Sequence, residues 1–114
     1  MSESTLRERS TDFAVEIIKL CETIKGHYSL VNQLERSATS IGANIRESNY
    51  AHSKADFIAK LQIALKECSE SEYWIELLLE SGYYKDKSLL DNCTEVKRIL
   101  ISSLNTAKTN QDNK

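Results

Sequence analysis

Apolar residues recur every three or four positions along almost the whole chain, the spacing of one face of an α-helix. Four such segments are separated by short polar connections. They predict helices over about residues 4–24, 29–50, 54–81 and from about 86 to 105. Short connections between long helices favour antiparallel neighbours, so the pattern predicts an all-α, up-down-up-down antiparallel four-helix bundle.

Capping residues support these boundaries. Gly26 and Gly82 follow the first and third segments, where glycine commonly ends a helix. Ser53 precedes the third segment with Asp56 three positions later, a variant of the capping box. Residues 106–114 are polar, and we expect them to be frayed.

The expected core positions share one stripe per helix when each residue advances about 100° around the axis. In the first, second and fourth segments they are Leu6, Phe13, Ile17, Leu20, Cys21, Ile24, Val31, Leu34, Ala38, Ile41, Gly42, Ile45, Leu89, Leu90, Cys93, Val96, Leu100 and Leu104. In the third they are Phe57, Ile58, Leu61, Ala64, Leu65, Cys68, Ile75 and Leu79. A glycine inside a helix costs about 1 kcal/mol relative to alanine, so Gly42 predicts a close contact with a neighbouring helix.

The third segment carries a second apolar stripe, made of Ile63, Trp74 and Leu77, about 140–200° from Leu61. A monomeric bundle needs one apolar stripe per helix, so this face predicts a subunit interface with Trp74 as anchor. The alternative is that these are isolated apolar side chains on the surface of a monomer.

A polar stripe of Arg36, Ser40, Asn44 and Glu47 runs along the second segment, roughly opposite Ala38. Arg36 can donate a forked pair of hydrogen bonds to a carboxylate or a phosphate. We interpret the stripe first as a polar network between helices or subunits. A ligand or phosphate site and an ordinary solvated face are the two alternatives.

Composition narrows the class of protein. A chain of 114 residues forms one domain, residues 1–114, and the absence of proline favours long helices. Three separated cysteines indicate reduced core thiols rather than a zinc site. The N-terminus lacks the apolar core of a signal peptide, and no segment approaches the roughly 20 apolar residues of a membrane span. We therefore expect a cytoplasmic protein with no membrane partner.

Recognisable catalytic or metal-binding chemistry is missing from the pattern. The acidic run of Glu67, Glu70, Glu72, Glu76 and Glu80 has no Glu-x-x-His motif, which ferritin-like metal sites require. No nucleophile elbow or glycine-rich phosphate loop occurs. We expect no catalytic residues, no metal and no cofactor, and hence a protein that is not an enzyme.

The segment Gln33–Glu47, together with Phe57, Leu61, Ile63, Ala64, Glu70, Glu72, Tyr73, Gly82 and Tyr83, carries a family resemblance. From about Phe13 to Tyr84 the chain resembles the small bacterial proteins encoded in intervening sequences of 23S rRNA genes. The accessory variability determinant of diversity-generating retroelements is a relative of that family. The resemblance implies a four-helix bundle that assembles into homopentamers, with basic surfaces for nucleic acid in the retroelement members.

Two departures from the family pattern are local. Lys66 and Glu67 stand where many members have Gly-Ser, and Ser48 stands where a smaller residue is common after Glu47. A third concerns the whole chain, whose net charge is −2, whereas dedicated nucleic-acid binders usually have a basic excess or patch.

Two functions follow from the sequence. The first is a non-enzymatic homo-oligomer, a pentamer by resemblance, that acts as an accessory protein and binds RNA or DNA through basic residues of several subunits. Exposed tyrosines and lysines can stack on bases and contact phosphates, although Lys54, Lys60 and Lys66 spiral around their helix instead of forming a ridge. The alternative is a scaffold or adaptor that binds a protein partner and has no affinity for nucleic acid.

Overall fold

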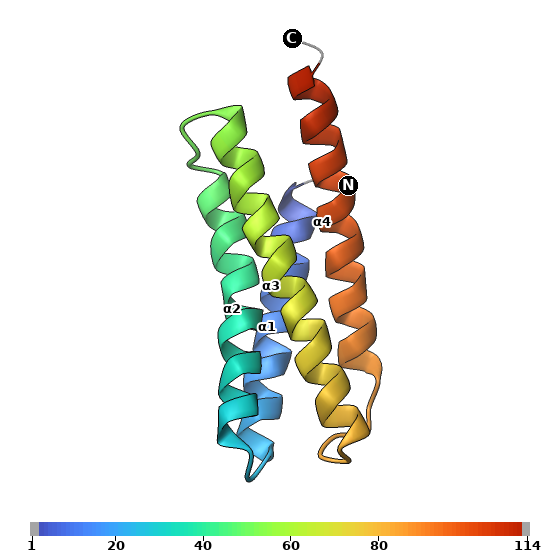
Figure 1. Ribbon diagram of the computed structural model, residues 1–114. Helices are drawn as coiled ribbons and strands as arrows, with labels where there is room; N and C mark the ends of the chain where they lie inside the picture. The colour runs from blue at the N-terminus through green and yellow to red at the C-terminus, as the bar shows by residue number, and fades with distance from the viewer. Residues whose placement is uncertain (1–2, 113–114) are drawn as a thin grey trace.

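The computed structural model describes residues 3–112 and confirms the all-α four-helix fold. The helices are α1 (Glu3–Thr23), α2 (Tyr28–Ser48), α3 (Lys54–Glu80) and α4 (Ser88–Asp112). Consecutive helices run in opposite directions, and α1 also packs against α4, which closes a bundle measuring 51 × 21 × 19 Å (Figure 1). Both the α1–α2 and α3–α4 loops therefore lie at one end, and the α2–α3 loop lies at the other.

The capping residues act largely as expected. The Ser53 hydroxyl accepts a hydrogen bond from the Asp56 amide at 3.1 Å, and the Asp56 carboxylate accepts one from the His52 amide at 3.2 Å. At the end of α3, Gly82 has φ +82°, and the amides of Gly82 and Tyr83 donate to the carbonyls of Leu79 and Leu78. This is a Schellman motif, which satisfies two carbonyls at the helix end and turns the chain towards α4.

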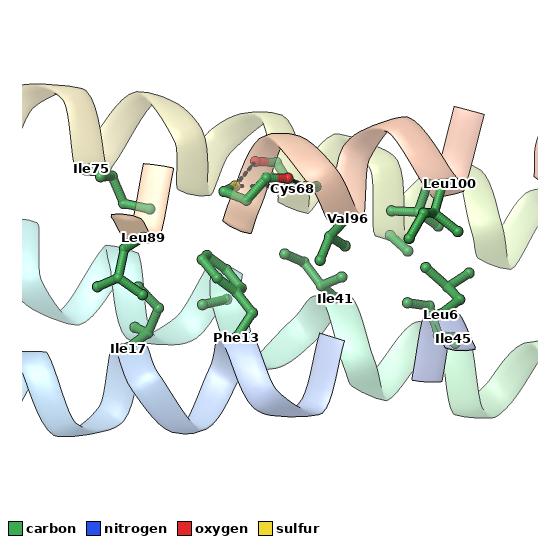
Figure 2. Packing of buried hydrophobic residues seen from close by; sticks show 14 of the residues in the cluster. Leu6, Phe13, Ile17, Ile41, Ile45, Cys68, Ile75, Leu89, Val96 and Leu100 are labelled. Carbon is green, nitrogen blue, oxygen red and sulfur yellow. Dashed lines mark hydrogen bonds between the residues drawn. The ribbon is translucent and has the colours of Figure 1, made fainter. Parts of the chain in front are cut away.

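The core is a column of side-chain layers along the bundle axis. Phe13, Ile17, Ile41, Cys68 and Val96 point into it from all four helices (Figure 2). Most of the expected core positions are buried. Leu20, Cys21, Phe57, Leu65, Leu79 and Leu90 are only partly buried at its edge, and Gly42 is also partly exposed.

The largest departure from the expected core lies on α3. The buried positions alternate steps of three and four residues, which is the 3.5-residue repeat of a coiled coil. They are Leu61, Ala64, Cys68, Ser71, Ile75 and Leu78. A wheel at 100° per residue drifts by about 20° per heptad from this repeat. The prediction that Leu79 is the buried residue near the end of α3 is therefore wrong, because Leu78 takes that place.

The C-terminal segment also differs from the expectation of fraying from residue 106. Helix α4 continues to Asp112, because Leu104 and Ala107 are buried on the side that faces the bundle. Residues 113–114 lie outside the described residues. None of the helices, over the described part of the chain, is long and apolar enough to cross a membrane.

Candidate functional site

Arg36 on α2 is the centre of a polar cluster between α2 and α3. Its guanidinium reaches Glu67 Oε2 through Nη1 and Glu70 Oε2 through Nη2, both at 3.4 Å, and its Nε donates to Gln33 Oε1. The arginine side chain is 54% exposed, whereas those of Glu67 and Glu70 are 11% and 35% exposed. The polar network expected between helices is therefore present at Arg36, with the acids supplied by α3.

The other members of the predicted polar stripe do not join this cluster. The amide nitrogen of Asn44 donates to the Ser40 carbonyl of its own helix at 2.9 Å. Glu47 forms a separate ion pair with Lys60 of α3, at 3.9 Å. The stripe thus consists of two separate α2–α3 ion-pair groups with Ser40 and Asn44 between them, both partly buried.

A pair of buried serines lies beside Arg36 on the core side of the same two helices. Ser37 and Ser71 are fully buried, and their hydroxyl oxygens are 2.8 Å apart. Each hydroxyl also lies within hydrogen-bonding distance of a carbonyl of its own helix, Leu34 and Glu67 respectively. Sequence reasoning missed this pair, which the heptad positions of α3 would have revealed.

The predicted outer face of α3 is divided in the structure. Ile63 is 42% exposed and Leu77 is partly buried, and the heptad position between them is taken by Glu70. Trp74 instead packs against the core, at the heptad position of Glu67, and its indole nitrogen is buried without a hydrogen-bond partner among the described residues. The prediction that Trp74 lies on the outer face is therefore wrong, because the helical wheel drifts over the two heptads from Leu61.

The seam between α3 and α4 holds a close contact of two thiols. Cys68 and Cys93 are both fully buried, with their sulfur atoms 3.8 Å apart. The hydrogen bond with Cys68 and burial raise the pKa of the Cys93 thiol. Burial, with a smaller contribution from the charge of Glu35, raises the pKa of the half-buried Cys21 to about 11. All three thiols are therefore held protonated at neutral pH.

The acidic run of α3 is used in pairs between helices. Glu72 binds Lys97 of α4 at 3.1 Å, and Glu67 and Glu70 share Arg36. Between residues 3 and 112, the structure brings no three His, Cys, Asp or Glu side chains together in a group that could hold a metal ion.

Charge is divided between the two ends of the bundle, a feature that sequence reasoning missed. We call residues 5–13, 39–67 and 96–110 the basic end; they contain nine Lys or Arg and five Asp or Glu, a net charge of +4. Residues 14–38 and 68–95, the acidic end, contain five Lys or Arg and ten Asp or Glu, a net charge of −5. The net charge of −2 for the whole chain conceals this separation.

Comparison with known proteins agrees with the fold. Residues 2–102 match the family described as 23S rRNA-intervening sequence protein. A crystal structure of a protein with unknown function, from the S23 ribosomal protein family of Bacteroides thetaiotaomicron, is 41% identical and superposes with a TM-score of 0.86. The alignment covers 92% of this chain and 99% of that one. No curated protein matches the chain.

Proposed function

Because the chain belongs to the family of 23S rRNA-intervening sequence proteins, we propose that it is a homo-oligomeric, non-enzymatic accessory protein that binds RNA or DNA through its basic end. The separation of charge supports the proposal, since nine cationic side chains against five acidic ones supply the patch that overall composition lacks. The family resemblance favours five copies. Neither the family description nor that of the crystal structure names a catalytic activity.

The outer face of α3 is the proposed contact between subunits. Ile63 remains exposed, and Leu77 is partly buried without belonging to the core. Charges on this face should reduce assembly, so we expect Ile63→Glu combined with Leu77→Lys to sediment as a smaller species with unchanged helical content. Trp74 is left intact in this variant because its side chain packs against the core. A wild-type protein that is monomeric at tens of micromolar, or a double variant that keeps its assembly, would contradict this interface.

Binding to nucleic acid is tested by the fluorescence anisotropy of labelled RNA and DNA, both single-stranded and structured, over a range of salt concentrations. Phosphate contacts release counterions, so log Kd should vary linearly with log salt, with a slope of about 0.7–0.9 per contact. We expect the variant Arg46→Glu with Lys108→Glu, two exposed positions of the basic end, to weaken binding and lower the slope by about 2.

The matched control reverses two exposed lysines of the acidic end, Lys85→Glu with Lys87→Glu. It changes the total charge by the same amount. Equal weakening by both pairs would show that total charge alone drives binding and would contradict a basic-end site. Retention of none of the strands at low salt would remove the nucleic-acid function.

In that outcome the scaffold function becomes the better proposal. The acidic end displays Tyr73 and Tyr83, which are 53% and 42% exposed, among an excess of carboxylates. Aromatic side chains surrounded by polar residues are typical of surfaces that bind a protein partner.

A further inference from the structure

The basic end contains a cavity of about 470 Å³ between all four helices. It lies where the start of α1 meets the end of α2, the start of α3 and the C-terminal half of α4, in the upper part of Figure 1. Its volume falls within the range of about 300–1,000 Å³ found for ligand sites, and bundles commonly place such sites between their helices.

One part of the cavity wall is apolar. Its side chains are Leu6, Ile45, Phe57, Leu61, Ile99 and Ala107. Five of these belong to the buried core, and Phe57 packs against its edge, so the wall is fixed by the packing of the bundle itself.

The other part of the wall is polar and comes mainly from α4. Its hydroxyl and amide side chains are Ser48, Asn49, Ser102, Ser103, Thr106 and Asn110. The side chains of Ser102, Ser103 and Thr106 make no hydrogen bond to the rest of the described chain, whereas the Ser48 hydroxyl donates to the Ile45 carbonyl. Donors and acceptors are therefore available to a ligand beside an apolar surface.

The charge of the cavity favours an anion. No Asp or Glu lines it, and its two cations are Lys54 and Arg98. Arg98 is held by Glu95 at 2.6 and 2.8 Å, which leaves Lys54 as the cation without a carboxylate partner in the described part of the chain. The Lys54 ammonium lies 5.4 Å from the centre of the Phe57 ring, so a negative group at Lys54 would lie beside an aromatic surface.

The geometry points to a binding site for one nucleotide unit. A nucleotide combines apolar base faces, a hydrogen-bonding base edge and an anionic phosphate, which match the apolar wall, the hydroxyls of α4 and Lys54 in turn. A saturated acyl chain fits less well, because it would leave the row of hydroxyl and amide groups without partners. The unit is either a free mononucleotide or an unpaired nucleotide of a strand; for a strand, this inference rests on the proposed function.

Calorimetry with adenosine, cytidine, guanosine and uridine 5′-monophosphates tests the site, with adenosine lacking phosphate as the comparison. We expect at least one monophosphate to bind, and Lys54→Met to weaken its binding at least tenfold. Lys54→Arg should retain it, whereas Lys87→Met at the acidic end should have no effect. Ser103→Phe and Thr106→Phe, which fill the cavity from α4, should abolish binding while thermal unfolding remains cooperative.

The source of the nucleotide follows from single-stranded RNA and DNA measured with the same variants. Loss of both monophosphate and strand binding in Ser103→Phe and Thr106→Phe indicates an unpaired nucleotide, and loss of monophosphate binding alone indicates a free ligand. Unchanged strand binding in the filled variants, with no monophosphate bound by wild type at 10 millimolar, would overturn the cavity site. Loss of strand binding in Arg46→Glu with Lys108→Glu would in that case still support the proposed function.

Discussion

The Arg36 cluster allows a sharp test of how burial decides the value of an ion pair. Arg36→Met keeps much of the aliphatic stem but removes the charge and all donors, so the Glu67 carboxylate, 11% exposed, loses its cation at 3.4 Å. Removing one partner of a fully buried pair costs about 3–5 kcal/mol, and an exposed pair is worth less than about 1 kcal/mol. Because the Arg36 side chain is 54% exposed and the contacts are long, we expect a loss of about 1–2 kcal/mol.

Glu70 is the internal control, because it binds the same guanidinium at the same 3.4 Å but is 35% exposed. Glu70→Met should cost less than about 0.5 kcal/mol, since water replaces the arginine as partner of its neighbours. Combining Arg36→Met with Glu67→Met should recover most of the loss, because no buried charge is then left unpaired.

The free energy of unfolding is measured by urea denaturation at one fixed protein concentration, because the stability of an oligomer depends on concentration. The corresponding fall in melting temperature for Arg36→Met is roughly 4–8 °C for a domain of this size. Equal losses for Arg36→Met and Glu70→Met, or a double variant that loses the sum of the two single variants, would refute the argument from burial.

Three further predictions concern packing and thiol chemistry. Gly42→Ala should raise the free energy of unfolding by about 0.5–1 kcal/mol, since the added methyl meets its nearest atom of α1 at an ordinary 3.6 Å, whereas Gly42→Leu should lower it by about 1–3 kcal/mol; urea denaturation of both variants tests this. With Ellman's reagent at pH 8, Cys21 should react about 100-fold more slowly than an unperturbed thiol because its pKa is about 11, and Cys68 and Cys93 should react only on unfolding. Ala107→Gly in the last turns of α4 should lower the free energy of unfolding by about 1 kcal/mol, whereas a truly frayed segment would show no change in urea denaturation.

The helices and most of the core could be predicted from the sequence because each depends on local spacing. Apolar periodicity gave the four segments, and Gly82 and Ser53 marked helix ends that the structure confirms. The misplacement of Trp74 has a different cause. A straight-helix wheel is accurate over one or two turns, but the 3.5-residue repeat of packed helices accumulates about 40° between Leu61 and Trp74.

The polar cluster could be predicted only in part, for a related reason. The sequence identified Arg36 as a donor that needs an acid, but the choice among the five glutamates of α3 depends on the register between two antiparallel helices. That register is set by the length of the α2–α3 loop and by core packing, neither of which is visible in the spacing of α2 alone. The cavity between all four helices depends on tertiary structure in the same way.

The separation of charge shows how topology creates a surface that composition hides. Segments of weak and opposite net charge alternate along the chain, and only antiparallel packing gathers residues 5–13, 39–67 and 96–110 at one end. In a ring assembly a single rotation axis relates all copies, so their basic ends lie on one common circle. Five copies would place a net charge of +20 on that circle and −25 on the circle of acidic ends, from the +4 and −5 of each chain. A slightly acidic chain can therefore present a polyanion with a strongly positive surface, and the assembly is what makes nucleic-acid binding compatible with a net charge of −2 per chain.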